Sequence, residues 1–201
     1  MNAAAPRRVG VFGGAFDPPH RVHRALARLA LRHLGLDALH VIPTGHAWHK
    51  ARALSPAAHR LAMCRLAFAR LPGVVIDPCE LARPGPSYTA DTLAELRARH
   101  PQAQLLLLIG ADQWRALPTW HRWRDVLALA TPVVAARPGA TLADSPLGAP
   151  PRTLPWPARD MSSTAVRAAA AAGADVAALA TLVPAAVARY IVRHGLYRPG
   201  V

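Results

Sequence analysis

One short segment near the start of the chain restricts the fold more than any other. An apolar stretch, Val9–Phe12, stops at Gly13 and Gly14, and a turn with two prolines then leads into a helical pattern that opens at His20. A strand, a glycine turn and a helix start in this order let backbone N–H groups approach a ligand closely. His20 and His23 share one face of the helix near its positively polarised end. The segment therefore suits a polyphosphate ligand.

Strand and helix patterns alternate along the rest of the chain. Strands are predicted over residues 39–42, 74–76, 105–109 and 132–136, with a short further strand near Leu154. Helices are predicted after the glycine turn, after Ser55-Pro56 as N-cap and first helical residue, from a cap at Ser87–Thr89, and over 126–130. A last helical section starts at Ser162 and is interrupted at Gly173 and Pro184.

This alternation predicts an α/β fold built on a doubly wound parallel sheet. The run 105–109 is apolar without interruption, which is typical of a central strand covered on both faces. We expect one domain over 1–201, with an α/β core at 7–160 and a C-terminal helical section at 161–201. Ligands of such sheets bind beyond the carboxyl ends of the strands. The glycine turn, residues 44–50, residues 110–112 and residues 162–167 all follow strands, so we expect them to share one cleft.

The bulk composition restricts location and partners. Hydrophobic residues make up 52% of the chain and charged residues 17%, as in a soluble globular protein, and no apolar run reaches membrane-spanning length. The N-terminal residues lack the apolar segment of a signal peptide. Cys64 and Cys79 have neither metal-binding nor redox spacing, which favours a reducing cytoplasm. We therefore expect a cytoplasmic protein with no membrane partner.

The formal net charge of +13 raises the possibility of a nucleic-acid partner. The basic residues are spread along the chain rather than gathered in a block, and nearly all are arginine in a chain rich in alanine and proline. We therefore expect no nucleic-acid partner, and a solvated basic surface that helps to attract a phosphate-rich small molecule. Lys50 is the single lysine, and it offers a compact point charge where arginine offers a planar fork.

The histidine pair and the segment Ser162–Arg167 are the two candidate phosphate sites. Two histidines at i and i+3 without a nearby Glu or Cys supply too few ligands for zinc, and capping or packing is the structural alternative to phosphate contact. Ser162, Ser163 and Thr164 place hydroxyls at a helix start, and Arg167 lies one turn further on, where it can fork onto phosphate oxygens. An ordinary N-cap followed by a surface arginine is the alternative for this segment.

Three weaker signals lie between them. Gly110 permits close approach after the central strand, and Asp112 can accept ribose hydroxyls, organise a magnesium shell or cap a helix. Trp120 follows a proline turn, where it can stack on a flat heteroaromatic ring or fill a core. The segment Ser87–Thr92 reads only as a capped helix start.

Taken in order, these motifs resemble the bacterial nicotinate-nucleotide adenylyltransferases of the nucleotidyltransferase superfamily. The resemblance covers nearly the whole chain, from Gly13–His23 to the tail around Tyr197. The first and last phosphate motifs are similar across the superfamily, whereas Tyr88-Thr89 and the Pro118-x-Trp120 segment point to the nicotinate mononucleotide branch. The family usually has Gly where this chain has Val22.

The resemblance implies a Rossmann-like fold and transfer of the adenylyl group of ATP to nicotinate mononucleotide, with release of pyrophosphate. It implies a catalytic set, an ATP set, an acceptor set and Mg²⁺ bound mainly through the ATP phosphates. The catalytic residues would be His20, His23, Lys50 and Arg167. The residues that bind ATP would be Gly13, Gly14, Phe16, His20, His23, Gly110, Asp112, Ser162, Ser163, Thr164 and Arg167. The residues that bind the nicotinate nucleotide would be Asp17, Lys50, Thr89 and Trp120.

Two alternative acceptors remain open from the sequence. Transfer to phosphopantetheine uses similar first and last motifs, but that branch usually has Thr at the position of His20 and lacks Pro-x-Trp. Nicotinamide mononucleotide differs from the nicotinate compound only by an amide, and the sequence does not place the backbone donors that tell them apart. A nucleotide-binding or RNA-binding module without catalysis is the alternative of another class.

Overall fold

Six parallel strands form one sheet in the order β3-β2-β1-β4-β5-β6. The computed structural model describes residues 7–46, 53–136, 151–156 and 161–198. The strands are β1 (Arg8–Gly14), β2 (Ala38–Pro43), β3 (Val74–Ile76), β4 (Gln104–Gly110), β5 (Thr131–Ala136) and β6 (Arg152–Pro155). The doubly wound parallel sheet is thus confirmed, including the short strand near Leu154.

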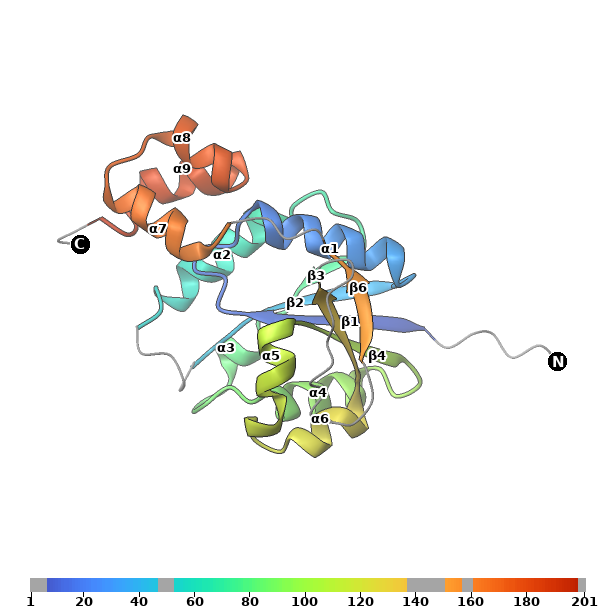
Figure 1. The fold of residues 1–201 in the computed structure, drawn as a ribbon. Coiled ribbons are helices and arrows are strands. Elements are labelled where there is room, and N and C mark those ends of the chain that lie inside the picture. Colours follow the sequence, from blue (N-terminus) through green and yellow to red (C-terminus); the bar gives the residue numbers. More distant parts are fainter. Residues whose placement is uncertain (1–6, 47–52, 137–150, 157–160, 199–201) are drawn as a thin grey trace.

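Helices cover both faces of this sheet (Figure 1). One face carries α1 (Arg21–His33), α2 (Ala57–Phe68) and the C-terminal helices α7 (Ser163–Ala171), α8 (Val176–Leu182) and α9 (Ala185–Arg193). The other face carries α4 (Thr89–Arg99), α5 (Ala111–Ala116), the 3-10 turn η1 (Leu117–Thr119) and α6 (Trp123–Leu129). A single helical turn, α3 (Cys79–Ala82), lies between β3 and α4.

Each face has its own hydrophobic core, because successive side chains of a strand point to opposite sides. In β1, Phe12 joins the core under α1 and α2, whereas Val9 and Val11 join the core under α4. The side chains of β4 alternate in the same way, so this strand is buried on both faces. The uninterrupted apolar run at 105–109 predicted this burial.

The strand order reverses between β1 and β4. From β1 the chain moves outward to β2 and β3, and from β4 it moves outward in the opposite direction to β5 and β6. A crevice forms at such a switch point beyond the carboxyl ends of the strands. The turn after Gly14 and the turn after Gly110 flank this switch point, where the sequence predicted a ligand cleft.

Two predicted helix caps are wrong. α2 starts at Ala57 with Pro56 as N-cap, and Ser55 makes no cap, because tertiary partners hold its backbone. α4 starts at Thr89 after Tyr88, and the hydroxyl of Ser87 instead accepts a hydrogen bond from the backbone of His46 at 3.1 Å. The short helices α3 and α5 were not predicted, since they are too short to show a period.

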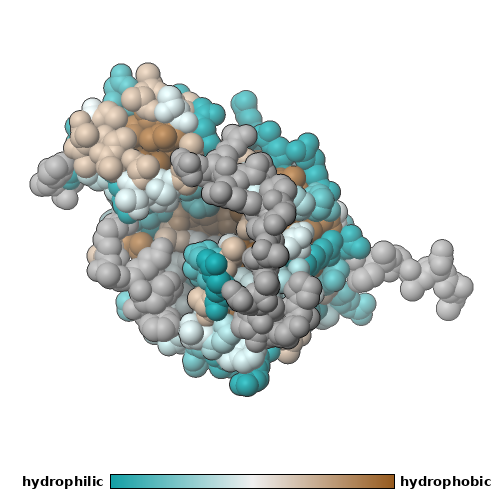
Figure 2. Space-filling model, in the orientation of Figure 1, coloured by the Kyte–Doolittle hydropathy of each residue, from teal (hydrophilic) through white to brown (hydrophobic). Residues whose placement is uncertain are grey.

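The C-terminal helices continue the sheet-and-helix body on the side of α2. Ser162 caps α7 as predicted, since its hydroxyl accepts a hydrogen bond from the backbone N–H of Ala165 at 3.1 Å. In Figure 2 the outer surface over α8 and α9 is mostly tan to brown, in keeping with helices composed largely of alanine, leucine and valine. No helix in the described ranges is long and apolar enough to cross a membrane.

Candidate active site

The turn after β1 presents backbone on one side and a packed ring on the other. Gly13 is exposed, and a Cβ there would meet no atom within 4 Å. Phe16 has a left-handed backbone with φ of 45°, which is uncommon for a residue other than glycine. The residue is 2% exposed, and its ring packs edge-on against Phe12 and Phe68, with ring centroids 5.3 Å and 6.0 Å apart. The Phe16 ring is therefore part of the hydrophobic core, and contact of Phe16 with ATP stays a prediction.

His20 and His23 lie against each other at the start of α1. Their rings are stacked, with centroids 3.7 Å apart and planes at 21°. The backbone N–H of His20 donates to Nδ1 of His23 at 3.1 Å. In a neutral imidazole this leaves the proton on Nε2, from which it can be donated. Nδ1 of His20 is buried without a hydrogen-bond partner in the described structure.

Burial keeps both imidazoles neutral in the free protein. It lowers the pKa of His20 to about 4. It also holds the pKa of His23 well below its usual value, and the neighbouring His20 lowers it further. The pair is therefore uncharged at pH 7, and an arriving polyphosphate anion would favour its protonation. Part of the capping alternative is also present, because His23 accepts the His20 N–H at the helix start.

The segment Ser162–Arg167 packs directly against this turn. The hydroxyl of Ser163 donates to the carbonyl of Pro18 at 2.9 Å. One guanidinium nitrogen of Arg167 donates to the carbonyl of Asp17 at 2.9 Å, and the other donates to the hydroxyl of Thr164 at 2.9 Å. The bonds to Pro18 and Asp17 join residues 145 and 150 positions apart in the sequence, so the two predicted phosphate motifs lie side by side.

Asp17 holds the turn to two other parts of the molecule. Asp17 as a whole residue is 1% exposed. One carboxylate oxygen accepts from the backbone of Ser55 at 3.1 Å, and the other accepts from the hydroxyl of Tyr197 at 2.7 Å. These bonds support a structural role, and contact of Asp17 with the acceptor nucleotide stays a prediction.

Gly110 and Asp112 lie where β4 passes into α5. Gly110 is the N-cap of α5, and no side chain caps this helix, so Asp112 is not the cap that we considered. The Asp112 carboxylate is exposed and accepts from the side chain of Gln113 at 3.1 Å. It therefore remains accessible to a ribose or a hydrated metal ion.

The two segments expected to hold the pyridine ring are close to each other. Tyr88 precedes Thr89, the first residue of α4, and its ring lies 4.1 Å from that of His121, the residue after Trp120. Arg122 has a left-handed backbone with φ of 52° and pairs with Asp91 of α4 at 3.1 Å. Trp120 itself is partly buried against the core of this face. One side of the Trp120 indole can thus pack against this core while its exposed side stays available to a nicotinate ring.

Lys50 lies outside the described residues, so its predicted role is not addressed by the structure. Within the described ranges, no group of three or more His, Cys, Asp or Glu side chains is arranged to hold a metal ion. The donor set near the two phosphate motifs consists of imidazole, hydroxyl and guanidinium groups. This set suits phosphate oxygens better than it suits a bare divalent cation.

Sequence reasoning missed two buried charged residues next to these turns. Arg60 of α2 is 2% exposed and donates to main-chain carbonyls, and Glu80 of α3 is buried beside Thr92. A signal for Arg60 was present, because it occupies a core position of the helical period that continues through Met63, Cys64 and Ala67.

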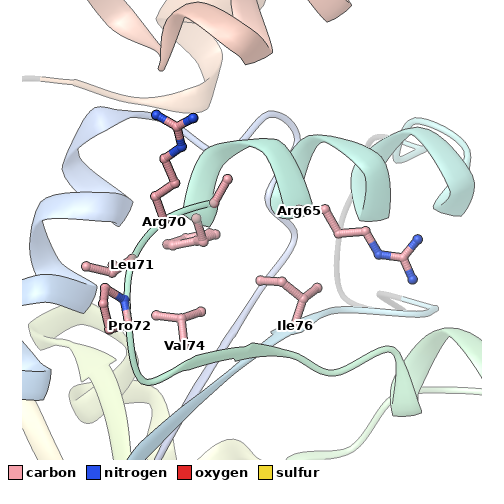
Figure 3. Close-up of a pocket in the computed structure, with 8 residues that line it drawn as sticks. Arg65, Arg70, Leu71, Pro72, Val74 and Ile76 are labelled. Carbon is pink, nitrogen blue, oxygen red and sulfur yellow. The ribbon is translucent and has the colours of Figure 1, made fainter.

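A cavity of about 350 Å³ lies away from these motifs, along the edge strand β3 (Figure 3). Its lining comes from the end of α2 and from β3: Arg65, Phe68, Ala69, Arg70, Leu71, Pro72, Val74 and Ile76. None of the predicted site residues lines it. We therefore place the candidate active site at the switch point between β1 and β4 and not in this cavity.

Comparison with known sequences finds the family that the motifs resemble. The cytidylyltransferase-like family matches residues 11–169. A protein of Albidiferax ferrireducens named "Probable nicotinate-nucleotide adenylyltransferase" is 52% identical over 198 residues, which cover 96% of this chain and 98% of that protein. A protein of the same name from Methylibium petroleiphilum is 45% identical, covering 99% of this chain and 96% of its own length.

Solved structures share the fold. Nicotinic acid mononucleotide adenylyltransferase of Plasmodium falciparum complexed with NaAD has a TM-score of 0.80 at 16% identity, covering 95% of this chain and 97% of its own. A putative nicotinate-nucleotide adenylyltransferase from Vibrio parahaemolyticus has a TM-score of 0.70 at 19% identity, with 96% of each chain covered. Because the sequence relatives named above are up to 52% identical over nearly its full length and the family model matches most of it, this chain belongs to the nicotinate-nucleotide adenylyltransferases within the cytidylyltransferase-like family.

Proposed function

We propose that this protein transfers the adenylyl group of ATP to nicotinate mononucleotide, releasing pyrophosphate and forming nicotinate adenine dinucleotide. The observation that carries the proposal is the junction of the two phosphate motifs, where Ser163 and Arg167 bond to the carbonyls of Pro18 and Asp17. This junction holds hydroxyl and guanidinium groups of α7 against the turn that leads to His20 and His23. The names of the full-length relatives support the choice of acceptor.

The reaction is a single in-line displacement at phosphorus. An oxygen of the acceptor's 5′-phosphate bonds to the α-phosphorus of ATP while the bond to the bridging oxygen breaks, and that oxygen leaves with pyrophosphate. Such a reaction needs positioning and charge stabilisation rather than a covalent enzyme intermediate. His20, His23 and Lys50 would donate to the transferred phosphate, and Ser162, Ser163, Thr164 and Arg167 would hold the departing pyrophosphate.

The geometry leaves donors for this task. Arg167 has five N–H donors, of which the Asp17 and Thr164 bonds use two. Ser162 accepts from the backbone of Ala165, so its own O–H is still available to donate. We propose that Mg²⁺ enters with the ATP phosphates and offsets their charge.

The remaining contacts follow the two sides of the switch point. Gly13, Gly14 and the backbone of Phe16 would approach the ATP phosphates, and Gly110 and Asp112 would border its ribose. Thr89 and Trp120 would hold the nicotinate ring, and Asp17 would contact the same nucleotide. We also propose that the chain works as one domain in the cytoplasm, in keeping with its free cysteines Cys64 and Cys79.

The test is pyrophosphate release by the purified protein with ATP, Mg²⁺ and one of three acceptors: nicotinate mononucleotide, nicotinamide mononucleotide or phosphopantetheine. We expect the highest kcat/KM with nicotinate mononucleotide and loss of activity in EDTA. A higher kcat/KM with either other acceptor would overturn the assignment of the substrate.

A further inference from the structure

We infer that Arg60, a buried residue of α2 whose side chain bonds to main-chain carbonyls, positions the backbone of the active site for adenylyl transfer. The inference rests on the proposed function. It concerns how the turn after β1 and the loop after β2 are held in one arrangement, together with the backbone bond from Thr44 to Gly14 at 2.9 Å and the bond from Ser55 to Asp17 at 3.1 Å.

Arg60 gathers carbonyl groups from three separate stretches of backbone. Its guanidinium donates to the carbonyls of Ala15 at 3.2 Å and Thr44 at 2.6 Å, with a longer bond to Gly45 at 3.4 Å. Its Nε donates to the carbonyl of Ser55 at 2.9 Å. One side chain thus ties the turn after β1 to both ends of the connection between β2 and α2.

The bond to Ala15 fixes the direction of the next N–H group. In a trans peptide the C=O and the following N–H point in opposite directions. With the Ala15 carbonyl turned inward to Arg60, the N–H of Phe16 is turned the other way, and no backbone carbonyl of the described residues accepts it. Phe16 also has a φ of 45°, a conformation that persists only where its surroundings impose it.

The loop after β2 is held from two opposite sides. Arg60 binds the carbonyls of Thr44 and Gly45. The N–H groups of the same two peptides point away from Arg60. The N–H of Gly45 donates to the carboxylate of Glu80. The N–H of His46 donates to the hydroxyl of Ser87 at 3.1 Å. The fit is tight, because a Cβ on Gly45 would overlap the carbonyl of Glu80.

A buried guanidinium serves this purpose where other cations do not. Its planar fork presents donors in several fixed directions, whereas a lysine presents one mobile ammonium. Arg60 also lies close enough to Asp17 for their charges to attract, so the buried carboxylate that anchors the turn has a cation beside it. Any cation could balance the charge of Asp17, but only a guanidinium can donate to four carbonyls in fixed directions at once.

The test compares Arg60→Lys and Arg60→Ala with Arg24→Ala as a matched control. Arg24 likewise donates to two carbonyls, those of Ala67 at 2.7 Å and Ala69 at 2.9 Å, but these lie at the far end of α2. Pyrophosphate release is measured per folded molecule, with the folded fraction taken from a denaturation curve at the assay temperature. Methylguanidinium is then added to the Arg60→Ala protein.

We expect kcat to fall by on the order of 10²-fold in Arg60→Ala, because a small misplacement of the reacting groups has an effect of this size. The KM for ATP should rise by less than about fivefold, since the groups that bind ATP are still present. Arg60→Lys keeps the charge but should still lose at least about tenfold in kcat. Arg24→Ala should keep kcat within about twofold, and methylguanidinium should restore part of the activity of Arg60→Ala.

An unchanged kcat per folded molecule in Arg60→Lys overturns the inference, and this variant decides the matter if Arg60→Ala does not fold. A loss in Arg24→Ala equal to that in the Arg60 variants also overturns it, because the effect would then be general. Failure of the proposed function would be distinguishable, since the unmodified protein would then lack pyrophosphate release.

Discussion

The imidazole rings of His20 and His23 are stacked with their centroids 3.7 Å apart, at the N-terminus of a helix that follows the first strand. The pair is neutral in the free protein, because burial lowers both pKa values. Neutral imidazoles can donate hydrogen bonds to a phosphate without repelling each other. A neutral imidazole can also take up a proton as negative charge develops on a phosphate beside it.

His20→Ala should lower kcat by on the order of 10²- to 10³-fold, the usual cost of removing one transition-state donor. Pyrophosphate release under saturating ATP and nicotinate mononucleotide measures the effect. His33→Ala is the control, because His33 is exposed at the other end of α1. Equal kcat in the two variants would exclude His20 from the reaction.

The free energy of unfolding should fall as the pH is lowered from about 6.5 toward 4. The folded-state pKa of His20, about 4, lies below the unfolded value near 6.5, so the unfolded chain binds more protons in this window. The contribution of His20 is on the order of 3 kcal/mol, present above the window and lost within it. Urea unfolding at several pH values measures it, and His20→Asn should flatten the slope. An equal slope in both proteins would contradict the lowered pKa.

A second acid-sensitive contact should act at lower pH. Asp77 is buried, which opposes its ionisation, yet hydrogen bonds from His40 at 2.9 Å, Arg99 at 2.7 Å and the Cys79 backbone hold its pKa well below the usual range. Its stabilisation is therefore present above about pH 4 and lost as the pH falls further. Asp77→Asn should reduce the free energy of unfolding by about 2 kcal/mol or more at pH 7. The difference from the unmodified protein should narrow in acid, and a constant difference would argue against this linkage.

Arg167→Lys should reduce kcat/KM by roughly 10- to 100-fold, although the charge is kept. Lysine cannot bond to both Asp17 and Thr164 while still presenting a fork to phosphate. Steady-state kinetics with varied ATP measures the change. Arg189→Lys on the exposed side of α9 controls for replacement of an arginine in the same helical section. Unaltered kinetics in Arg167→Lys would mean that a point charge suffices there.

Trp120 and Asp112 should affect different substrates. Trp120→Ala should raise KM for nicotinate mononucleotide by about 10-fold or more, because stacking of a base on an aromatic ring is worth roughly 1–3 kcal/mol. Asp112→Asn should raise KM for ATP by roughly 10-fold through the loss of a charge-assisted hydrogen bond. Each variant is the control for the other. A rise in both KM values in both variants would contradict the separation of the two sub-sites.

The sequence alone was sufficient for the order of the six strands along the chain and for the longer helices between them. Val9–Phe12 and the run 105–109 predicted their strands because burial on two faces leaves a continuous apolar pattern. Ser162 predicted its helix cap, because a cap is a local hydrogen bond within three residues. Such features depend on neighbours in the chain, so the sequence carries them directly.

Tertiary structure decided which of these segments meet. Ser163 reaches Pro18 and Arg167 reaches Asp17 only because the sheet reverses its strand order and α7 returns to its carboxyl edge. Ser55 resembled a helix cap in sequence, but Asp17 and Arg60 hold its backbone instead. Arg60 itself looked like one more arginine in a basic chain. The helical period could have placed Arg60 in the core, but not the carbonyls that it binds, because those of Ala15 and Thr44 lie in turns far from it in the sequence.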